Sequence, residues 1–178
     1  MQVTDPLSLS GDMLDGAKSY LRIDGDAEDA ALGEIMLAAI AQAENFCGQM
    51  ILRRGVRETI TATRQWQTLT TGPIMTLTSA TGIPAEGAGF AFAPDAWEAK
   101  ISSYGEGYVR IIRPGIAGRV EITCTAGIAP GWGELHEGLR LGILRLAAHL
   151  YSHRDAADGA GLPAAVTALL RPWRKVRL

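Results

Sequence analysis

Hydrophobic residues recur every three or four positions in two long stretches of the chain, a spacing that places them on one side of an α-helix. The first stretch covers about five turns and stops at Gly48, which suits the left-handed turn that ends many helices. Asp26 is its predicted N-cap, and Glu28 and Asp29 follow where the helix dipole favours acids. The second stretch is residues 135–155. The inward positions are Leu32, Ile35, Met36, Ala39, Ile40, Ala43, Phe46 and Cys47 in the first stretch, and Leu139, Gly142, Ile143, Leu146, Ala147, Leu150 and Tyr151 in the second.

Two shorter helices are predicted near the ends of the chain. The first is capped by Ser10, or by Gly11 after it, and stops near Ile23. Pro163 suits the first turn of the last helix, which ends before Pro172 because a residue preceding proline avoids helical backbone angles. In the second long stretch, Gly142 either lets another helix approach closely or is a tolerated cost of about 1 kcal/mol relative to alanine.

Between the helical stretches, residues 56–127 are threonine-rich and alternate between apolar and polar positions, with glycine and proline breaks that are typical of strands. Residues 113–118 are a predicted loop because Pro114 cannot donate to a sheet, and residues 82–94 are expected to be flexible or irregular. In the last strand, Val120, Ile122 and Cys124 alternate with polar residues, which indicates an antiparallel strand with one wet face. Residues 59–63 and 66–69 are predicted to form one strand or two, and residues 74–78 another. Residues 108–112 and 119–125 are the best predicted pair of strands.

Together these patterns predict an α+β fold, in which two long helices plus short N- and C-terminal helices form a mainly helical scaffold with an inserted small antiparallel β-sheet. We expect a single domain over residues 1–178, with helical parts at 10–52 and 134–171, a β-rich insertion at 56–127 and a basic C-terminal tail at 171–178. A chain of 178 residues buries a core without covalent staples, so Cys47 and Cys124 are expected to be buried thiols. The absence of an apolar run near the roughly 20 residues of a membrane span, and of a signal peptide, predicts a soluble, unexported chain.

The charge is unevenly distributed along the chain although the net charge is only −2. Residues 1–45 carry two bases and nine acids, residues 46–138 eight of each, and residues 139–178 seven bases and two acids. Either each part has its own solvated face, or the acidic surface of one copy meets the basic surface of the next, as in a head-to-tail ring. Arginine outnumbers lysine by fourteen to three, and arginine is the better residue for interface pairing.

One candidate metal site is the pair His149 and His153, which is spaced to hold a metal between two imidazoles on a helix, with Asp155 or Asp158 as a third ligand. Zinc proteases with such a pair have a glutamate after the first histidine, whereas this chain has Leu150 there. We therefore favour a structural role for both histidines, and we expect no metal.

Other motifs that bind ions or phosphates are incomplete. Asp24, Asp26 and Glu28 resemble the start of a calcium loop, but Asp29 occupies the position of the required glycine and Ile35 that of the required glutamate. The glycines at 105 and 107 are not followed by a third glycine or by a phosphate-binding lysine. No nucleophile motif is present, so we expect neither an enzyme nor a cofactor.

The C-terminal tail is the strongest candidate for a binding surface. With a pI near 5.9, the chain lacks the strongly basic character of a dedicated nucleic-acid binder. An aromatic anchor flanked by arginines is instead typical of residues that dominate protein–protein interfaces. The predicted docking residues are Arg171, Trp173, Arg174, Lys175, Arg177 and Leu178.

The order of several segments resembles the head-tail connector family of long-tailed phages, prophages and gene transfer agents, also called adaptor or head completion proteins. AKSYLRID at 17–24, the acidic pair at 28–29 and AENFCG at 43–48 are similar to its N-terminal signature. Residues 125–127, 138–155 and 162–174 are similar to its second half. The chain differs in lacking a proline just before the second long helix, at 135–137, and its strand region resembles the longer branch of the family with an inserted sheet.

This resemblance implies a structural virion protein without catalytic residues, which assembles as a dodecameric ring beneath the portal, extends the DNA channel and joins the capsid to the tail. The implied partners are the portal protein, the next connector or tail-completion protein, and passing DNA that is bound without sequence specificity. The implied location is the head-tail interface of the virion, after assembly in the bacterial host cytoplasm. We expect the tail at 171–178 to dock on the portal, because its composition suits docking and because it is free to extend past Pro172. Removing it should therefore cost little stability.

Three other functions stay open at this point. The chain could be a DNA-binding regulator that uses its last helix and basic tail, a metal-binding protein that uses His149 and His153, or another ring-forming virion part such as a tail terminator. Steep salt dependence of duplex DNA binding would favour the regulator. Bound metal that is lost on substitution of His153 would favour the metal protein.

Overall fold

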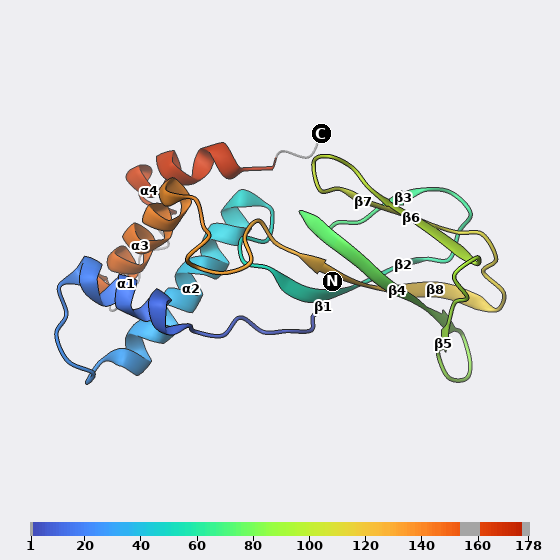
Figure 1. The fold of residues 1–178 in the computed structure, drawn as a ribbon, viewed down its shortest axis with the longest axis horizontal. Helices are drawn as coiled ribbons and strands as arrows, with labels where there is room; N and C mark the ends of the chain where they lie inside the picture. The colour runs from blue at the N-terminus through green and yellow to red at the C-terminus, as the bar shows by residue number, and fades with distance from the viewer. Residues whose placement is uncertain (1, 154–160, 176–178) are drawn as a thin grey trace. The chain divides into compact units, whose positions relative to one another are not determined.

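The protein, in a computed structural model that describes residues 2–153 and 161–175, combines helices with antiparallel sheets and confirms the predicted α+β class (Figure 1). The chain divides into two compact units. The strand unit comprises Met1–Pro6 and Leu52–Ile128, and the helical unit comprises Leu7–Ile51 and Ala129–Leu178. Each unit is therefore built from segments that are separated in the sequence.

Among its described residues, the helical unit contains four α-helices: α1 at Gly11–Leu21, α2 at Asp29–Cys47, α3 at Glu137–Ser152 and α4 at Ala164–Leu170. A single 3-10 turn at Arg171–Trp173, η1, follows α4. The central residues of the two predicted apolar faces expose at most 1% of their surface, which confirms the inward side of both long helices. The largest of these core residues are Leu32, Met36, Ile40, Leu139, Ile143 and Leu146. The predicted inward positions Ile35, Phe46, Leu150 and Tyr151 are only partly buried.

The C-terminal end of α2 is as predicted, but its start is not. Gly48 adopts the left-handed conformation, with a φ of 66°, and ends the helix. The prediction of Asp26 as N-cap is wrong, because Glu28 is the residue that precedes the first helical residue, Asp29. Asp26 lies in the preceding turn, where its carbonyl accepts a hydrogen bond from the Asp29 N–H and its carboxylate pairs with Lys18.

Gly142 marks a close approach between α3 and α4, which decides between the two interpretations of this glycine. A β-carbon at this position would lie 2.9 Å from Leu170 Cδ2 and 3.3 Å from Leu169 Cβ. The absence of a side chain therefore lets the last helix pack tightly against α3.

The described part of the strand unit, from residue 2 onward, forms two antiparallel sheets. The three-stranded sheet has the order β3-β7-β6, and the five-stranded sheet has the order β1-β2-β8-β4-β5. In Figure 1, β2, β8 and β4 run side by side. The strand bounds are β1 Gln2–Val3, β2 Arg54–Thr61, β3 Gln67–Thr68, β4 Ile74–Pro84, β5 Phe90–Ala91, β6 Trp97–Ile101, β7 Gly107–Ile111 and β8 Ala117–Ala126.

The alternation in β8 is confirmed, since Val120, Ile122 and Cys124 are at most 1% exposed. The expectation that the strands at 108–112 and 119–125 pair with each other is wrong, because β7 lies in the three-stranded sheet whereas β8 pairs with β2 and β4. Alternation shows which side of a strand is buried, but it carries no information about the neighbouring strand.

Part of the stretch at 82–94 is ordered, in contrast to the expected irregular excursion. Gly82 pairs with Phe90 where β4 and β5 form an antiparallel pair. The ring of Phe90 covers Gly82 so closely that a β-carbon there would lie 2.7 Å from Cζ of the ring. An aromatic ring that covers a strand glycine supplies the packing that the glycine lacks.

One carboxylate is buried in the strand unit. Glu58 on β2 is 4% exposed and accepts hydrogen bonds from the Thr70 N–H, the Thr70 hydroxyl and the Thr71 N–H at 2.6, 2.7 and 2.9 Å. Burial by itself would raise the pKa of Glu58, but these donors outweigh it and hold the pKa below its usual value of 4.5. The carboxylate thus anchors the segment between β3 and β4 to β2.

Candidate functional site

The described part of the predicted docking tail packs against the helical unit itself. The Gln49 side-chain amide donates to the carbonyl of Trp173, and the Lys175 N–H donates to the carbonyl of Cys47 at 2.7 Å. The centroids of the Trp173 and His136 rings lie 5.1 Å apart, and the planes of the two rings are inclined at 54°. These contacts hold residues 171–175 beside the end of α2 and the residue that caps α3.

The expectation that the tail extends freely past Pro172 is therefore wrong for residues 173–175, and these contacts argue against the prediction that the tail can be removed at little cost. Trp173 is half-buried, whereas Arg171 and Arg174 are exposed, and the Arg174 guanidinium lies 5.6 Å from the Phe46 ring. Arg177 and Leu178 lie outside the described residues. The described part of the tail thus presents two exposed arginines on a segment that packs against the helical unit.

His149 and His153 lie together at the end of α3, with ring centroids 4.3 Å apart. His153 Nδ1 is 2.9 Å from the carbonyl of His149, so this ring nitrogen is used locally. The proposed third ligands, Asp155 and Asp158, lie outside the described residues. Within 2–153 and 161–175, no group of three histidine, cysteine or acidic side chains is placed to hold a metal ion.

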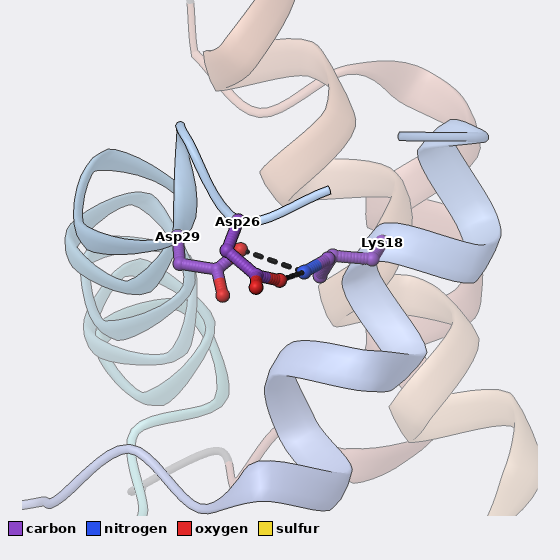
Figure 2. A network of polar contacts seen from close by, with 3 residues as sticks. All are labelled: Lys18, Asp26 and Asp29. Carbon is purple, nitrogen blue, oxygen red and sulfur yellow. Dashed lines mark hydrogen bonds and ion pairs between the residues drawn. The ribbon is translucent and has the colours of Figure 1, made fainter. Parts of the chain in front are cut away.

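The acidic residues that resemble a calcium loop contact other side chains. Figure 2 shows Lys18 of α1 reaching both Asp26 and Asp29, with its ammonium 2.8 Å from one oxygen of each carboxylate. The hydrogen bonds to Asp26 and then Asp29 raise the pKa of Lys18 well above its usual value, and Lys18 in turn lowers the pKa of Asp26. Glu28 accepts a hydrogen bond from the Tyr151 hydroxyl at 2.7 Å. The arrangement ties α1 and α3 to the start of α2.

The cysteines and the glycine motif have structural roles. Cys47 and Cys124 are buried free thiols, as predicted, and burial raises the pKa of each to about 11. Gly105 has a φ of 74° in the turn between β6 and β7, where a β-carbon would lie 2.6 Å from Pro73 Cβ. Unreactive thiols and a tight turn of this kind do not provide catalytic groups.

Sequence reasoning missed an aromatic and cationic patch on the outer face of the three-stranded sheet. Lys100 and Arg110 lie over the ring of Trp66, at 4.5 and 4.8 Å from its centroid, and Lys100 is also 5.3 Å from the Tyr108 ring. Arg110 pairs with Glu98 at 2.6 Å. The sequence places Tyr108 and Arg110 on the same face of β7, which was the one available sign of this patch. Their partners Trp66 and Lys100 come from other segments, so the sequence pattern did not reveal the cluster. Tryptophan, tyrosine and arginine are the residues most enriched where proteins bind proteins.

A second surface is a shallow groove on the helical unit. Its volume is about 440 Å³, and five of its six lining residues lie on the outer side of α2. Ile35 and Leu150 make it apolar, and Glu34 and Gln42 contribute its polar groups. The lining residues are Ala31, Glu34, Ile35, Ala38, Gln42 and Leu150. The groove and the aromatic patch are surfaces suited to binding proteins.

No described helix is both long enough and apolar enough to cross a membrane.

Comparison with known proteins points to one structural family. Residues 12–104 match the phage gp6-like head-tail connector protein family. No curated protein matches the chain. A chain in the neck of an empty gene transfer agent particle, computed with C6 symmetry, is 32% identical with a TM-score of 0.78. Chains in the virion of a native gene transfer agent particle and in the neck of a native particle computed with C12 symmetry are each 31% identical, with TM-scores of 0.75 and 0.74. All three likenesses cover 100% of this chain and 97% of the other.

Proposed function

The chain belongs to the phage gp6-like head-tail connector family, and we propose that it forms a ring at the neck of a phage-like particle, extends the DNA channel and joins the capsid to the tail. The observation that carries this proposal is the likeness to chains from particle necks, which runs through both compact units at 31–32% identity. In this proposal the two units act together as one connector subunit. The virion neck is its final location, after assembly in the host cytoplasm.

The physical character of the chain supports a passive role in DNA passage. A conduit has to let DNA slide, and each phosphate bound by a cation resists that movement. A pI near 5.9 makes the subunit mildly acidic, which suits a channel wall that does not hold DNA. The surfaces found in the structure are suited to binding proteins, and in this proposal the chain has no catalytic role.

The partner on the head side is the portal protein, and the predicted docking tail is our candidate contact. Arg171 and Arg174 are exposed on a segment that Trp173 anchors to the helical unit. A fixed base lowers the entropy lost when the two arginines bind a partner. The partner on the other side of the ring is the next connector or tail-completion protein.

The ring is tested by mixing the full chain with the portal protein of the same particle and imaging the complexes by electron microscopy. We expect an additional ring with the rotational symmetry of the neck below the portal. Portal particles without added density, at concentrations where the chain is soluble and folded, would contradict the function.

The docking tail is tested separately with point variants, because deletion of residues 171–178 would also remove the packing of Trp173. Arg171→Glu and Arg174→Glu together should abolish portal binding while thermal unfolding stays close to that of the parent chain. Arg119→Glu, which reverses an exposed arginine on β8, is the matched control and should leave binding unchanged. Unchanged binding of the double variant would assign portal docking to another surface.

A further inference from the structure

We propose that neighbouring copies of this chain contact each other head to tail through their helical units, with the outer ridge of α3 of one copy seated in the α2 groove of the next. The α3 outer ridge is defined as Leu141, Leu144 and Ala148 with the flanking Arg140 and Arg145. This inference rests on the proposed ring, for which it names the subunit interface.

The α3 outer ridge lies on the side of its helix that faces away from the core. On α3, Leu139, Ile143 and Leu146 face inward and are at most 1% exposed. Leu141, Leu144 and Ala148 follow the spacing of three and four residues on the other side and are partly exposed. A ridge of this spacing fits a groove between helices, in the way that helices pack within a core.

The groove and the ridge are complementary in charge. Glu34 is exposed at the groove, whereas Arg145 is exposed and Arg140 partly exposed beside the ridge. Among the described residues, none forms an ion pair with any of these three side chains. Lys18, by contrast, has its carboxylate partners within the chain. Opposite charges on the groove and on the ridge favour a second copy as the occupant of the groove.

The symmetry of the similar structures supports this occupant. Chains like this one occur in particle necks computed with C6 and C12 symmetry. A cyclic ring repeats one heterologous contact, so that each subunit supplies two different surfaces. A groove on α2 and a ridge on α3 are two such surfaces within one compact helical unit, and neither uses the docking tail.

The interface is tested by cross-linking the full chain in rings formed on the portal. Ala38→Cys places a thiol in the groove, and Ala148→Cys places one on the ridge. The native Cys47 and Cys124 are at most 1% exposed and do not compete for a short bifunctional maleimide. The double variant should give a ladder of covalent multimers on a denaturing gel, whereas each single variant should stay monomeric.

The outcomes separate this inference from the function on which it depends. Rings that form without a ladder, or dimers from Ala38→Cys alone, would overturn the α2–α3 interface while leaving the ring intact. Absence of rings from the parent chain would overturn both.

Charge reversal provides a second, independent readout. Glu34→Arg or Arg145→Glu should each weaken ring formation roughly tenfold, and the two together should recover most of the loss. Glu86→Arg and Arg119→Glu reverse exposed charges on the strand unit and are the matched controls. Equal effects of the controls, or a double variant no better than the single ones, would refute the pairing.

Discussion

Glu58→Gln is the most informative single substitution for the strand unit, because it keeps the shape of a buried side chain and removes its charge. The carboxylate satisfies three donors from Thr70 and Thr71, two on one oxygen and one on the other. A glutamine keeps one accepting oxygen but turns an NH₂ group toward a donor. Losing one charge-assisted hydrogen bond and burying an unsatisfied N–H should lower the free energy of unfolding by about 2–4 kcal/mol.

Urea unfolding followed by tryptophan fluorescence measures this loss, since Trp66 and Trp97 lie in the strand unit. The urea midpoint should fall while the slope stays constant. Glu86→Gln, at an exposed loop position, is the control and should change stability by less than about 0.5 kcal/mol. A loss below about 0.5 kcal/mol for Glu58→Gln would refute the argument that Glu58 anchors the segment between β3 and β4.

The pH dependence supplies a separate check with a definite sign. The pKa of Glu58 is lower in the folded protein than its usual value of 4.5, so the unfolded chain binds the proton more readily. The stability that Glu58 contributes is therefore present above the usual pKa and is lost as the pH falls through the folded pKa. The difference in stability between the parent chain and Glu58→Gln should shrink below a pH of about 4.5. A difference that stays constant from neutral to acidic pH would contradict this assignment.

Three further substitutions test other parts of the fold. Gly127→Ala should lower the urea-unfolding free energy by about 2–5 kcal/mol, because Gly127 has a φ of 142° and a β-carbon there would lie 2.5 Å from Arg53 Cα. Lys18→Met should lower the midpoint of thermal unfolding, and the difference from the parent chain should decrease in 1 M salt because salt screens its ion pairs. Trp173→Ala should lower the free energy of unfolding, measured in urea, by about 1–2 kcal/mol, because the half-buried ring contacts His136. An unchanged free energy of unfolding would mean that the tail is not packed in solution.

The sequence was most informative where burial has a regular period. The apolar faces of α2 and α3, the end of α2 at Gly48 and the alternation in β8 all follow from local spacing. The N-cap of α2 was mispredicted because Asp26 pairs with Lys18, eight residues away, and local rules do not include that competition. The pairing of β8 was mispredicted for a similar reason, since its partners β2 and β4 come from elsewhere in the strand region.

The candidate surfaces were predicted only in part. The composition of the tail marked it as a docking segment, but its packing depends on Gln49 and on the carbonyl of Cys47, which are distant in the sequence. The cluster of Trp66, Lys100 and Arg110 likewise joins β6 and β7 with a residue just before β3. No single segment contains either site, so neither arrangement was visible before the fold.

The distribution of ion pairs separates stability from assembly. Charges that stabilise a subunit are paired within it, as Lys18 is with Asp26 and Asp29, whereas Glu34 and Arg145 have no ion-pair partner among the described residues. Salt weakens both kinds of ion pair, but apolar burial supplies most of the stability of a subunit, whereas the proposed ring contact depends on its charges. Raising the salt from about 0.05 to 0.5 M should therefore weaken ring formation, measured by sedimentation, well before it lowers the thermal midpoint of the subunit. Rings that persist unchanged over this range would mean that apolar contacts dominate the interface, and a parallel fall of both quantities would mean that salt acts on the fold.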